Sequence, residues 1–390
     1  MSSLYVSSTS ILIVSHQNVI QSNSTMTITS DDDLTEMATS GTGTLNDPFI
    51  LRVNIFKNWV NTMEVSNTRT YFIITKSLIW NRALSDFALA FKNVSHGSIE
   101  DSIIRGYDYS SDAGILVDNC TDVRIIRTNI NDCAFGIQLS GVKECLISNC
   151  TIYNNADGIH FYSASSTLIT WNTLVHNDIG ISAAGSTNRI YGNRIGWSSL
   201  NGYDYGTNAW DDGMSIGNSW SDYDGEGVYE ILGQNAGVDH YPSILQEGDY
   251  SGPVITNVIS DTPAADLLGL SIEHVKISVD VADLSGVDTV LLWSLQNGTF
   301  EYQEMILDGT SENGSYSYVF EGPFSSFSLD YFIWANDSEG YDNISEFCKV
   351  EFYPQYGIKI FSLIIYIVPV ALVITVLILF TRRWYRTHTT

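Results

Sequence analysis

Three consecutive segments of the chain share one pattern: AGILVDNCTDVRIIRTNINDC (113–133), FGIQLSGVKECLISNCTIYNN (135–155) and DGIHFYSASSTLITWNTLVHN (157–177). Four glycines mark the register, because Gly114, Gly136, Gly158 and Gly180 fall 22 residues apart and each precedes an isoleucine. A fixed period of this length is typical of a solenoid in which one repeat forms one turn. The middle of the chain is therefore expected to be a stack of similar turns.

Aligning the segments on these glycines produces columns that stay apolar from one repeat to the next. The columns are Ile115/Ile137/Ile159/Ile181, Val117/Leu139/Phe161/Ala183, Ile130/Ile152/Leu174 and, after a one-residue deletion, Ile125/Ile147/Ile169/Ile190. Within each repeat, apolar residues alternate with polar ones, which is the period of a β-strand. Asn, Asp, Gly and Ser separate the strands and leave no room for a helical crossover. The pattern predicts a parallel β-helix.

These segments resemble right-handed parallel β-helix repeats. The following 217–224 (GNSWSDYD) and 239–242 (DHYP) resemble the end of a NosD-like β-helix domain. Domains of this type are common in archaeal and bacterial surface proteins, and the wider group includes carbohydrate-binding proteins and sugar hydrolases. The resemblance covers 45–245 and implies a β-helix with a C-terminal cap. It is specific for the fold and weak for activity, since one fold supports many functions.

The segments on either side of the repeats differ from them in composition and in hydrophobic pattern. Residues 1–44 are interpreted as a weak or truncated signal sequence and a flexible Ser/Thr-rich lead-in. Residues 253–353 contain regularly spaced short strands, which predict a β-sandwich. Within this module, 283–288 and 331–337 look like Ig-like or fibronectin-like stalk modules of surface proteins. The fold class expected for the whole chain is all-β, with one membrane helix at its end.

That membrane helix is predicted at 358–381, where 360–380 contain no charged residue. At 1.5 Å per residue, such a run spans roughly 30 Å of hydrocarbon. Basic residues follow in 382–390, so this tail is expected in the cytoplasm and the large N-terminal region outside the cell. The membrane is therefore a predicted partner.

The charge of the chain excludes one class of partner. The 390 residues carry 44 acidic and 18 basic side chains, for a net charge of −26. Nucleic-acid binding needs basic patches, so no nucleic-acid partner is expected. The five cysteines show no metal-ligand spacing, and we expect those in the repeats to be buried free thiols.

An outward column between two apolar ones carries the candidate for catalysis. It consists of Leu116, Gln138, His160 and Ser182. Asp157 precedes His160 by three residues and Asp178 lies in the next turn, so a carboxylate could assist the imidazole as general base. The alternative is that all three are ordinary solvent-facing and turn residues. The Asn-Thr-Asp and Gly-His-Gly strings of polygalacturonase-like enzymes do not occur.

The cap region, 210–241, holds candidates for metal and ligand binding. Asp222, Asp224 and Glu226 alternate with small or aromatic residues, and such oxygen ligands suit Ca²⁺; a solvated acidic turn is the alternative. No other cofactor is expected, and the sequence contains no cluster of His, Met and Cys residues that could bind copper. Trp210, Trp220 and Tyr223 are candidates for stacking on sugar rings, and packing over the open end of the solenoid is the alternative.

Glycosylation sequons are frequent and suit an exported protein. They occur at Asn297, Asn313, Asn336 and Asn343 in the second module, and at Asn23, Asn93, Asn119 and Asn149 before it. Asn-rich turns create such strings by composition, so the four in the second module carry more weight.

Three functional classes remain open. The first is a membrane-anchored surface protein that mediates adhesion or recognises a polysaccharide or surface glycan without catalysis. The second is a surface-tethered polysaccharide lyase or glycoside hydrolase that uses the His160 face. The third is a structural component of the cell envelope.

Overall fold

The structure is a computed structural model of the chain. It describes residues 12–14, 19–22, 26–55, 62–81, 86–106, 113–235, 237–261, 271–296, 299–308, 313–339 and 341–352. The chain divides into two compact units, one ending at Tyr250 and the other beginning at Ser251. The first unit contains the repeats, and the second contains the strand-rich module that follows them.

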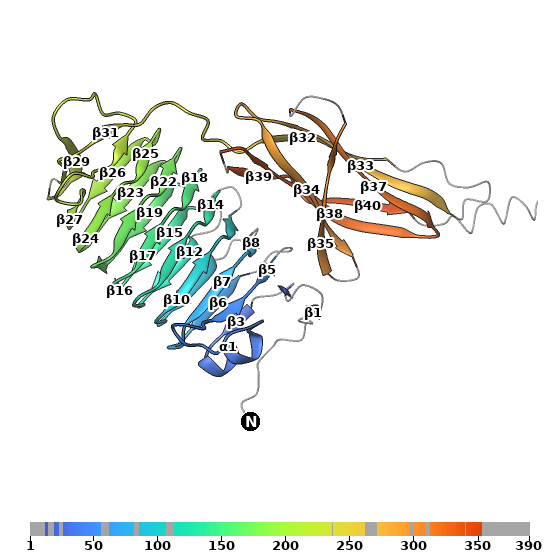
Figure 1. Ribbon diagram of the computed structural model, residues 1–390, viewed down its shortest axis with the longest axis horizontal. Coiled ribbons are helices and arrows are strands. Elements are labelled where there is room, and N and C mark those ends of the chain that lie inside the picture. Colours follow the sequence, from blue (N-terminus) through green and yellow to red (C-terminus); the bar gives the residue numbers. More distant parts are fainter. Residues whose placement is uncertain are drawn as a thin grey trace, which may run out of the picture. The chain divides into compact units, whose positions relative to one another are not determined.

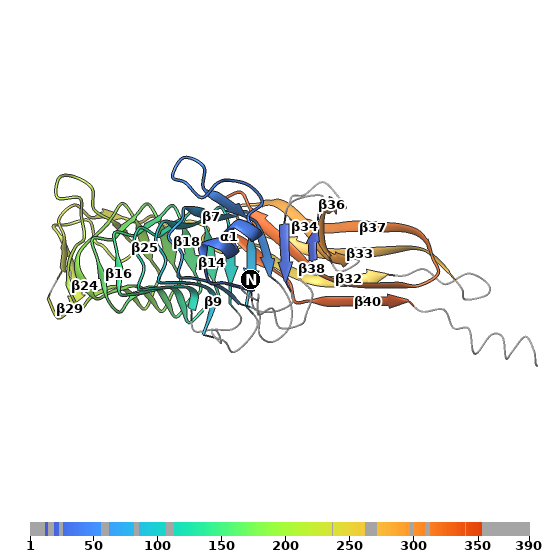
Figure 2. The same ribbon diagram turned by 90° about the horizontal axis from the view of Figure 1, so that it is seen from below.

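The first unit is a solenoid of three sheets, each of which takes one strand from successive turns (Figures 1 and 2). The first sheet contains β3 (Met26–Ile28), β6 (Met63–Ser66), β9 (Phe87–Lys92), β12 (Ala113–Asp118), β15 (Phe135–Ser140), β19 (Asp157–Phe161), β23 (Ile179–Ala183), β26 (Leu200–Asp204), β29 (Tyr229–Gly233) and β30 (Gly237–Asp239). The second contains β4 (Phe49–Leu51), β7 (Phe72–Thr75), β10 (Gly97–Glu100), β13 (Arg124–Ile126), β17 (Leu146–Ser148), β21 (Leu168–Thr170) and β24 (Gly185–Tyr191), continued by β20 (Ala164–Ser165), β16 (Val142–Lys143) and β27 (Thr207–Ala209). The third contains β1 (Leu12–Val14), β2 (Val19–Ser22), β5 (Val53–Ile55), β8 (Leu78–Trp80), β11 (Ile103–Arg105), β14 (Asn129–Asn131), β18 (Thr151–Tyr153), β22 (Thr173–Val175), β25 (Arg194–Gly196), β28 (Ser219–Trp220) and β31 (Ser243–Ile244).

The strand registers confirm the predicted apolar columns. Ile115 pairs with Ile137, Ile137 with Ile159, and Ile159 with Ile181, all in parallel. The columns on the second and third sheets pair in the same way, and their side chains form one buried core. Equivalent apolar residues of successive turns therefore stack on one another in the core, as the period predicts.

The glycines that mark the register are required by the close approach of neighbouring turns. A Cβ on Gly114, Gly136 or Gly158 would lie 2.7, 2.6 and 2.5 Å, respectively, from the carbonyl oxygen of the next glycine in the column. No side chain fits at such a distance without moving the backbone. The recurrence of glycine at the same position in successive turns therefore has a steric cause.

Buried polar side chains run along the corner between the second and third sheets and link successive turns. This polar ladder consists of Ser77, Ser102, Thr128, Cys150, Asn172, Asn193 and Asn218. At its C-terminal end each side-chain oxygen accepts the main-chain N–H of the preceding turn, with N···O distances of 3.0 Å from Asn172 to Asn193 and 3.1 Å from Asn193 to Asn218. The ladder satisfies corner amides that no strand can pair.

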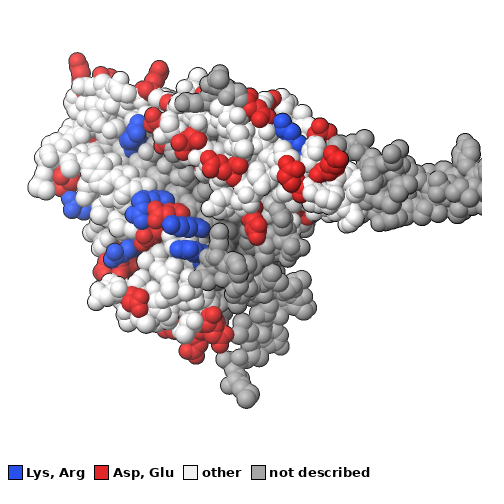
Figure 3. Space-filling model, turned by 45° about the vertical axis from the view of Figure 1, so that its right-hand side comes forward, with Lys and Arg blue, Asp and Glu red and all other residues white. Residues whose placement is uncertain are grey.

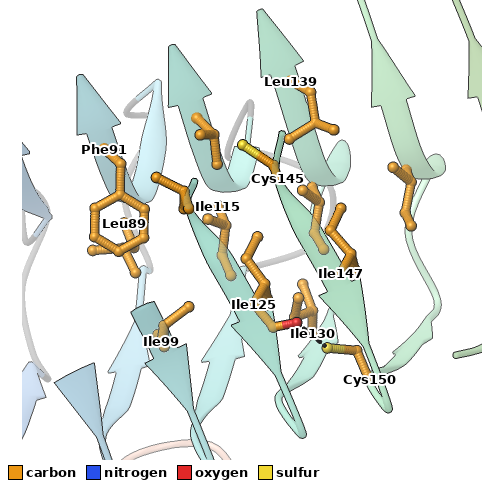
Figure 4. Close-up of a cluster of buried hydrophobic side chains, with 14 of the residues drawn as sticks. Leu89, Phe91, Ile99, Ile115, Ile125, Ile130, Leu139, Cys145, Ile147 and Cys150 are labelled. Atoms are coloured by element: carbon orange, nitrogen blue, oxygen red, sulfur yellow. Dashed lines mark hydrogen bonds between the residues drawn. The ribbon is translucent and has the colours of Figure 1, made fainter. Parts of the chain in front are cut away.

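Cysteines occupy corner positions in the earlier turns, and one of them, Cys150, belongs to the polar ladder. Cys150 lies one turn before Asn172, and its main-chain N–H donates to the Asn172 Oδ1 at 2.9 Å. Cys133 stands in the same relation to Asn155 at another corner, with an N···O distance of 3.0 Å. Cys145 and Cys150 lie beside the isoleucine columns (Figure 4). All four solenoid cysteines are free and buried, which confirms the prediction of buried thiols.

The expectation of a flexible lead-in up to residue 44 is wrong for its described part. Strand β3 already pairs with β6, and helix α1 (Asp31–Met37) follows it. Ser30 caps the helix by accepting the Asp33 N–H, and Leu34 is fully buried against the solenoid core. The Asp31 carboxylate accepts hydrogen bonds from the main chain of Arg69 and Thr70. The helix therefore packs on the solenoid rather than forming a separate segment.

The second unit consists of two antiparallel sheets that share one apolar core. One contains β32 (Val254–Asp261), β33 (Ile272–Ala282), β37 (Gly314–Phe324) and β36 (Ile306–Leu307). The other contains β35 (Thr299–Glu304), β34 (Val287–Gln296), β38 (Phe327–Asp337), β39 (Asp342–Ile344) and β40 (Cys348–Phe352). The structure thus confirms an all-β chain with a parallel β-solenoid followed by antiparallel sheets.

The predicted membrane helix at 358–381 and the tail at 382–390 lie outside the described residues. Among the residues that are described, no helix has the length and apolarity needed to cross a membrane.

Candidate functional site

His160 and Asp157 form a pair on the outer face of the first sheet. Both belong to β19, in which Gly158, Ile159 and Phe161 are buried while Asp157 and His160 are partly exposed. The His160 Nδ1 and the Asp157 Oδ2 lie 2.6 Å apart, and the two side chains are 19% and 14% exposed. An ionised carboxylate only accepts, so Nδ1 carries the proton in this pair and Nε2 is left for other contacts. The predicted contact between these residues is therefore present.

Asp178, the third candidate, does not join the pair. It is exposed, directly precedes β23 and makes no hydrogen bond to His160 within the described part of the chain. The His160 ring instead contacts Phe135 and Tyr162, with centroid distances of 5.0 and 4.5 Å. The structure brings together two of the three predicted catalytic candidates and adds aromatic neighbours.

Four rings form what we call the aromatic face: His160, Tyr162, Tyr203 and Tyr205. Tyr203 and Tyr205 lie on and directly after β26, with ring centroids 4.4 Å apart. The strand pairing places Ser182 between His160 and Tyr203, one turn from each. By the same register Ala184 separates Tyr162 from Tyr205, and these two tyrosines are 55% and 48% exposed. Two turns correspond to a separation of roughly 10 Å along the solenoid axis.

The predicted ligand-binding residues of the cap divide into two groups. Trp210 and Trp220 are fully buried in the solenoid core, so neither ring is available to a sugar. Their indole N–H groups donate to Asp204 and Asp239 at 2.8 and 3.0 Å. Tyr223 is partly buried, and its hydroxyl donates to the Gly227 carbonyl. Packing over the end of the core accounts for both tryptophans, which is the alternative that the sequence left open.

The predicted calcium ligands are used within the cap. Asp222 accepts hydrogen bonds from Asn201 Nδ2 at 2.7 Å and from the Tyr229 hydroxyl at 2.9 Å. Burial, together with the charge of Asp222, raises the pKa of Tyr229, which keeps its proton for this bond. Asp224 accepts the main-chain N–H of Glu226. Among the described residues no group of three or more His, Cys, Asp or Glu side chains could hold a metal ion.

A polar cleft with a volume of about 510 Å³ lies at the C-terminal end of the solenoid. Its walls come from β24, β27 and β30, and from His240, which follows β30. His240 is 63% exposed, and its Nδ1 lies 2.7 Å from Oδ2 of Asp211, which is 9% exposed. Burial acts to raise the pKa of Asp211, but hydrogen bonds from the imidazole and from the His240 and Gly213 main chain hold it below its ordinary value.

Sequence reasoning missed this cleft and also Tyr162. Asp211 and His240 are 29 residues apart, and the irregular cap between them removes the period that aligned the other columns. Arg189 lines the cleft, but nothing in the sequence around it distinguishes it from the other basic residues of the repeats. Tyr162 carried a usable signal, since it lies two residues after His160 and continues its outward phase one position beyond the strand.

The sequons of the second unit are placed as follows. Asn297 lies outside the described residues. The Asn313 side chain bonds both main-chain groups of Asp283, at 2.9 and 2.7 Å. Asn336 is half-buried, and the Asn343 Oδ1 accepts the Ile344 N–H. A glycan on Asn313 would break a hydrogen bond that its amide nitrogen donates.

The acidic side chains are spread widely over the face shown in Figure 3, whereas the basic ones gather in a few places. Ion pairs account for several of the basic side chains, among them Arg127 with Asp101 at 2.6 Å and Lys92 with Glu64 at 2.8 Å. The surface therefore offers no broad basic area on this face.

Three sheets wind around one core, and their strands pair in parallel except for β1 with β2 and β29 with β30; this arrangement defines a parallel β-helix protein. The model of the family described as periplasmic copper-binding protein (NosD) matches residues 16–225, which is more than half of the chain. The chain therefore belongs to this family, and the resemblance seen in its repeats is confirmed. No curated protein matches the sequence.

Solved structures of low sequence identity are similar to the chain. One is the A-module of the mannuronan C-5 epimerase AlgE6 of Azotobacter vinelandii, with 14% identity, a TM-score of 0.32, and coverage of 50% of this chain and 61% of that one. Another is the tailspike protein gp49 of Pseudomonas phage LKA1, with 10% identity, a TM-score of 0.32, and coverage of 85% and 67%. The enzymatically active domain of tailspike protein 2 of bacteriophage CBA120 has 10% identity, a TM-score of 0.27, and coverage of 78% and 65%. The chain thus spans less than two thirds of the length of the epimerase module.

The described residues do not fit the copper named in the family description. Proteins bind copper with His, Cys and Met ligands. His96, His160 and His240 each pair with a single aspartate rather than with one another. Burial raises the pKa of Cys120 and Cys150 to about 12, so these thiols stay protonated inside the core.

Proposed function

We propose that this protein recognises a polysaccharide at the cell surface without cleaving it, and that the aromatic face is the binding surface. One observation carries the proposal: Tyr162 and Tyr205 are exposed directly after β19 and β26, two turns apart, and the small, partly buried Ala184 follows the strand between them. Tyrosine presents an apolar ring and a polar tip, which suits a sugar with an apolar face and hydroxyl edges. Repeated rings at a fixed spacing fit a repeating ligand.

The polar groups beside these rings support the same ligand. Gln138 is the neighbour of His160 on β15 and is partly exposed. The His160 imidazole is oriented by Asp157 and offers Nε2 to a hydroxyl group. The net charge of −26 favours an uncharged ligand over an anionic one such as nucleic acid.

The C-terminal part of the chain supports a location at the membrane. The uncharged run at 360–380 and the basic residues after it are the features of an anchor with a cytoplasmic tail. The two packed sheets of the second unit are compatible with an Ig-like spacer on the outer side of the membrane. The solenoid would then be presented to the surroundings of the cell, where glycans occur.

The test is to incubate the purified full-length chain with a panel of polysaccharides and to measure both retention and the release of new chain ends. We expect retention without new ends, and we expect Tyr162→Ala and Tyr205→Ala to weaken it at least 10-fold each. Tyr302→Ala is the matched control, because Tyr302 is 50% exposed but lies in the second unit. Equal retention by all three variants would rule out the aromatic face.

The contact between His160 and Asp157 favours a second candidate function, a polysaccharide lyase or hydrolase. A carboxylate that orients an imidazole is the arrangement of a general base. In this case new chain ends appear in the panel, and His160→Ala abolishes their formation. Unchanged turnover in that variant would eliminate this site as a catalytic centre.

A further inference from the structure

The cleft at the end of the solenoid begins where the aromatic face ends. Tyr205 is followed directly by Gly206 and Thr207, and both of these line the cleft. Two residues span at most about 7 Å of chain, so a ligand lying on Tyr205 can reach the cleft without leaving the surface. The last tyrosine of the aromatic face and the first residues of the cleft wall are therefore neighbours on the solenoid.

The groups that line the cleft divide into satisfied and available ones. Asp204 is satisfied, because its carboxylate accepts from the Gly206 N–H, the Asn208 amide and the Trp210 indole at 2.7, 2.8 and 2.8 Å. The Asn188 Nδ2 donates a hydrogen bond to the Asn208 Oδ1 at 2.8 Å. These residues build the wall and have little capacity left for a ligand.

Four groups keep donors or acceptors for a ligand. Arg189 is exposed and uses one Nη2 hydrogen for the Asp212 carbonyl, which leaves other guanidinium N–H groups. His240 uses Nδ1 for Asp211 and keeps Nε2. Asn235 donates Nδ2 to the Gly206 carbonyl and keeps its Oδ1, and the Thr207 hydroxyl is exposed. Mixed donors and acceptors match hydroxyl groups, each of which can both donate and accept.

The charge of the cleft argues against an anionic ligand. Arg189 is the one Lys or Arg side chain among the described lining residues, and Asp204 and Asp211 are both acidic. The lining therefore carries no excess of positive charge, on a chain whose net charge is −26. A volume of about 510 Å³ lies within the range of small-molecule pockets, roughly 300–1,000 Å³.

We propose that this cleft binds one uncharged sugar unit, the end of a polysaccharide chain that runs over the aromatic face. The inference rests on the proposed function and deepens it, because it defines where the chain ends and which class of sugar it contains. A site that accepts a chain end recognises termini as well as internal repeats. Binding should then depend on the number of free ends as well as on polysaccharide mass.

The test is isothermal titration of the full-length chain with methyl glycosides of glucose, galactose and mannose, and with glucuronate as the charged probe. We expect at least one neutral glycoside to bind and glucuronate to bind at least 10-fold more weakly. Ala209→Trp fills the cleft from an exposed lining position and should weaken binding of the glycoside at least 10-fold. Val228→Trp is the control, since Val228 is 47% exposed and does not line the cleft.

Arg189→Gln provides a second variant that leaves the cleft open, and it should weaken binding 3- to 10-fold by removing a donor. Unchanged affinity in both Ala209→Trp and Arg189→Gln, binding of glucuronate alone, or no binding of any probe would overturn the proposal. The two proposals fail separately. If Tyr162→Ala and Tyr205→Ala abolish polysaccharide retention while the cleft variants change nothing, the aromatic face stands and the cleft does not.

Discussion

Replacing Asn193 by alanine removes the middle residue of the three asparagines at the C-terminal end of the polar ladder. The Asn193 Oδ1 accepts from both the main-chain N–H and the Nδ2 of Asn172 at 3.0 Å. The two hydrogens of its Nδ2 are shared among three acceptors, the carbonyl oxygens of Ile169 and Tyr191 and the Oδ1 of Asn218, at 3.0, 3.2 and 2.9 Å. Asn193 is fully buried, so water cannot replace these partners. An orphaned buried donor costs about 1–3 kcal/mol, and each further lost hydrogen bond about 1 kcal/mol. The expected loss is about 3–5 kcal/mol in the free energy of unfolding.

The assay is urea denaturation of the full-length chain followed by circular dichroism, with Asn46→Ala as the control. Asn46 lies in an exposed turn, and its replacement should change stability by no more than about 0.5 kcal/mol. Asn193→Ser should recover part of the loss, because in an earlier turn the Ser77 hydroxyl accepts the Val53 N–H at 2.8 Å. If Asn193→Ala is no less stable than Asn46→Ala, the ladder does not hold the turns together.

Further predictions concern the glycine column, the thiols and acid stability. Gly158→Ala should lower the thermal stability of the solenoid several-fold more than Gly202→Ala, as measured by thermal unfolding. A Cβ at position 158 would lie 2.5 Å from the Gly180 carbonyl oxygen, whereas a Cβ at position 202 would lie 3.4 Å from the nearest ring atoms. Cys120, Cys145 and Cys150 should resist a thiol-specific maleimide until denaturant is added, since burial raises their pKa values to about 12, 11 and 12; rapid labelling of any of them in the native chain would contradict the described core. The pKa of Asp211 is held below its unfolded value of 3.8, so its contribution to stability is present above that pH and is lost as the pH falls through the lower folded value. Asp211→Asn should flatten this part of the acid unfolding curve, and an unchanged curve would show that the contact with His240 contributes nothing.

The outer face of the solenoid was only partly predictable. The alternation within each strand placed His160 outside. It did not place Asp157 beside it, because residues three apart in a regular strand face opposite sides, and the contact forms where the buried pair Gly158 and Ile159 interrupts the alternation. The outward phase of His160 continues to Tyr162, which directly follows β19 and is exposed. Asp178 was assigned to the neighbouring turn, but one position before a strand its side chain is directed by the corner rather than by the pleat. Corners have no period of their own, so sequence spacing gives no direction there.

The corner positions of the solenoid show a different limit of the sequence analysis. Cys133, Cys145 and Cys150 do not lie one period from another cysteine, so the sequence offered no pattern among them. They do lie one period before Asn155, Thr167 and Asn172, and the structure shows that these residues share corner positions. A column defined by hydrogen bonding rather than by hydrophobicity tolerates Ser, Thr, Cys and Asn alike. A search for identical residues therefore does not find it.

By itself the sequence determined the solenoid, its register and the inward columns, because a repeat that stacks on itself makes every contact between equivalent positions, and these are visible as a period. It also determined the strands of the second unit, where alternation and turn residues are local signals. The tertiary structure alone decided the buried state of Trp210 and Trp220, the docking of α1, and the meeting of Arg189, Asp211 and His240 around one cleft. The cap folds back over the end of the core without a repeat, so its contacts join residues whose separation follows no rule that the sequence displays.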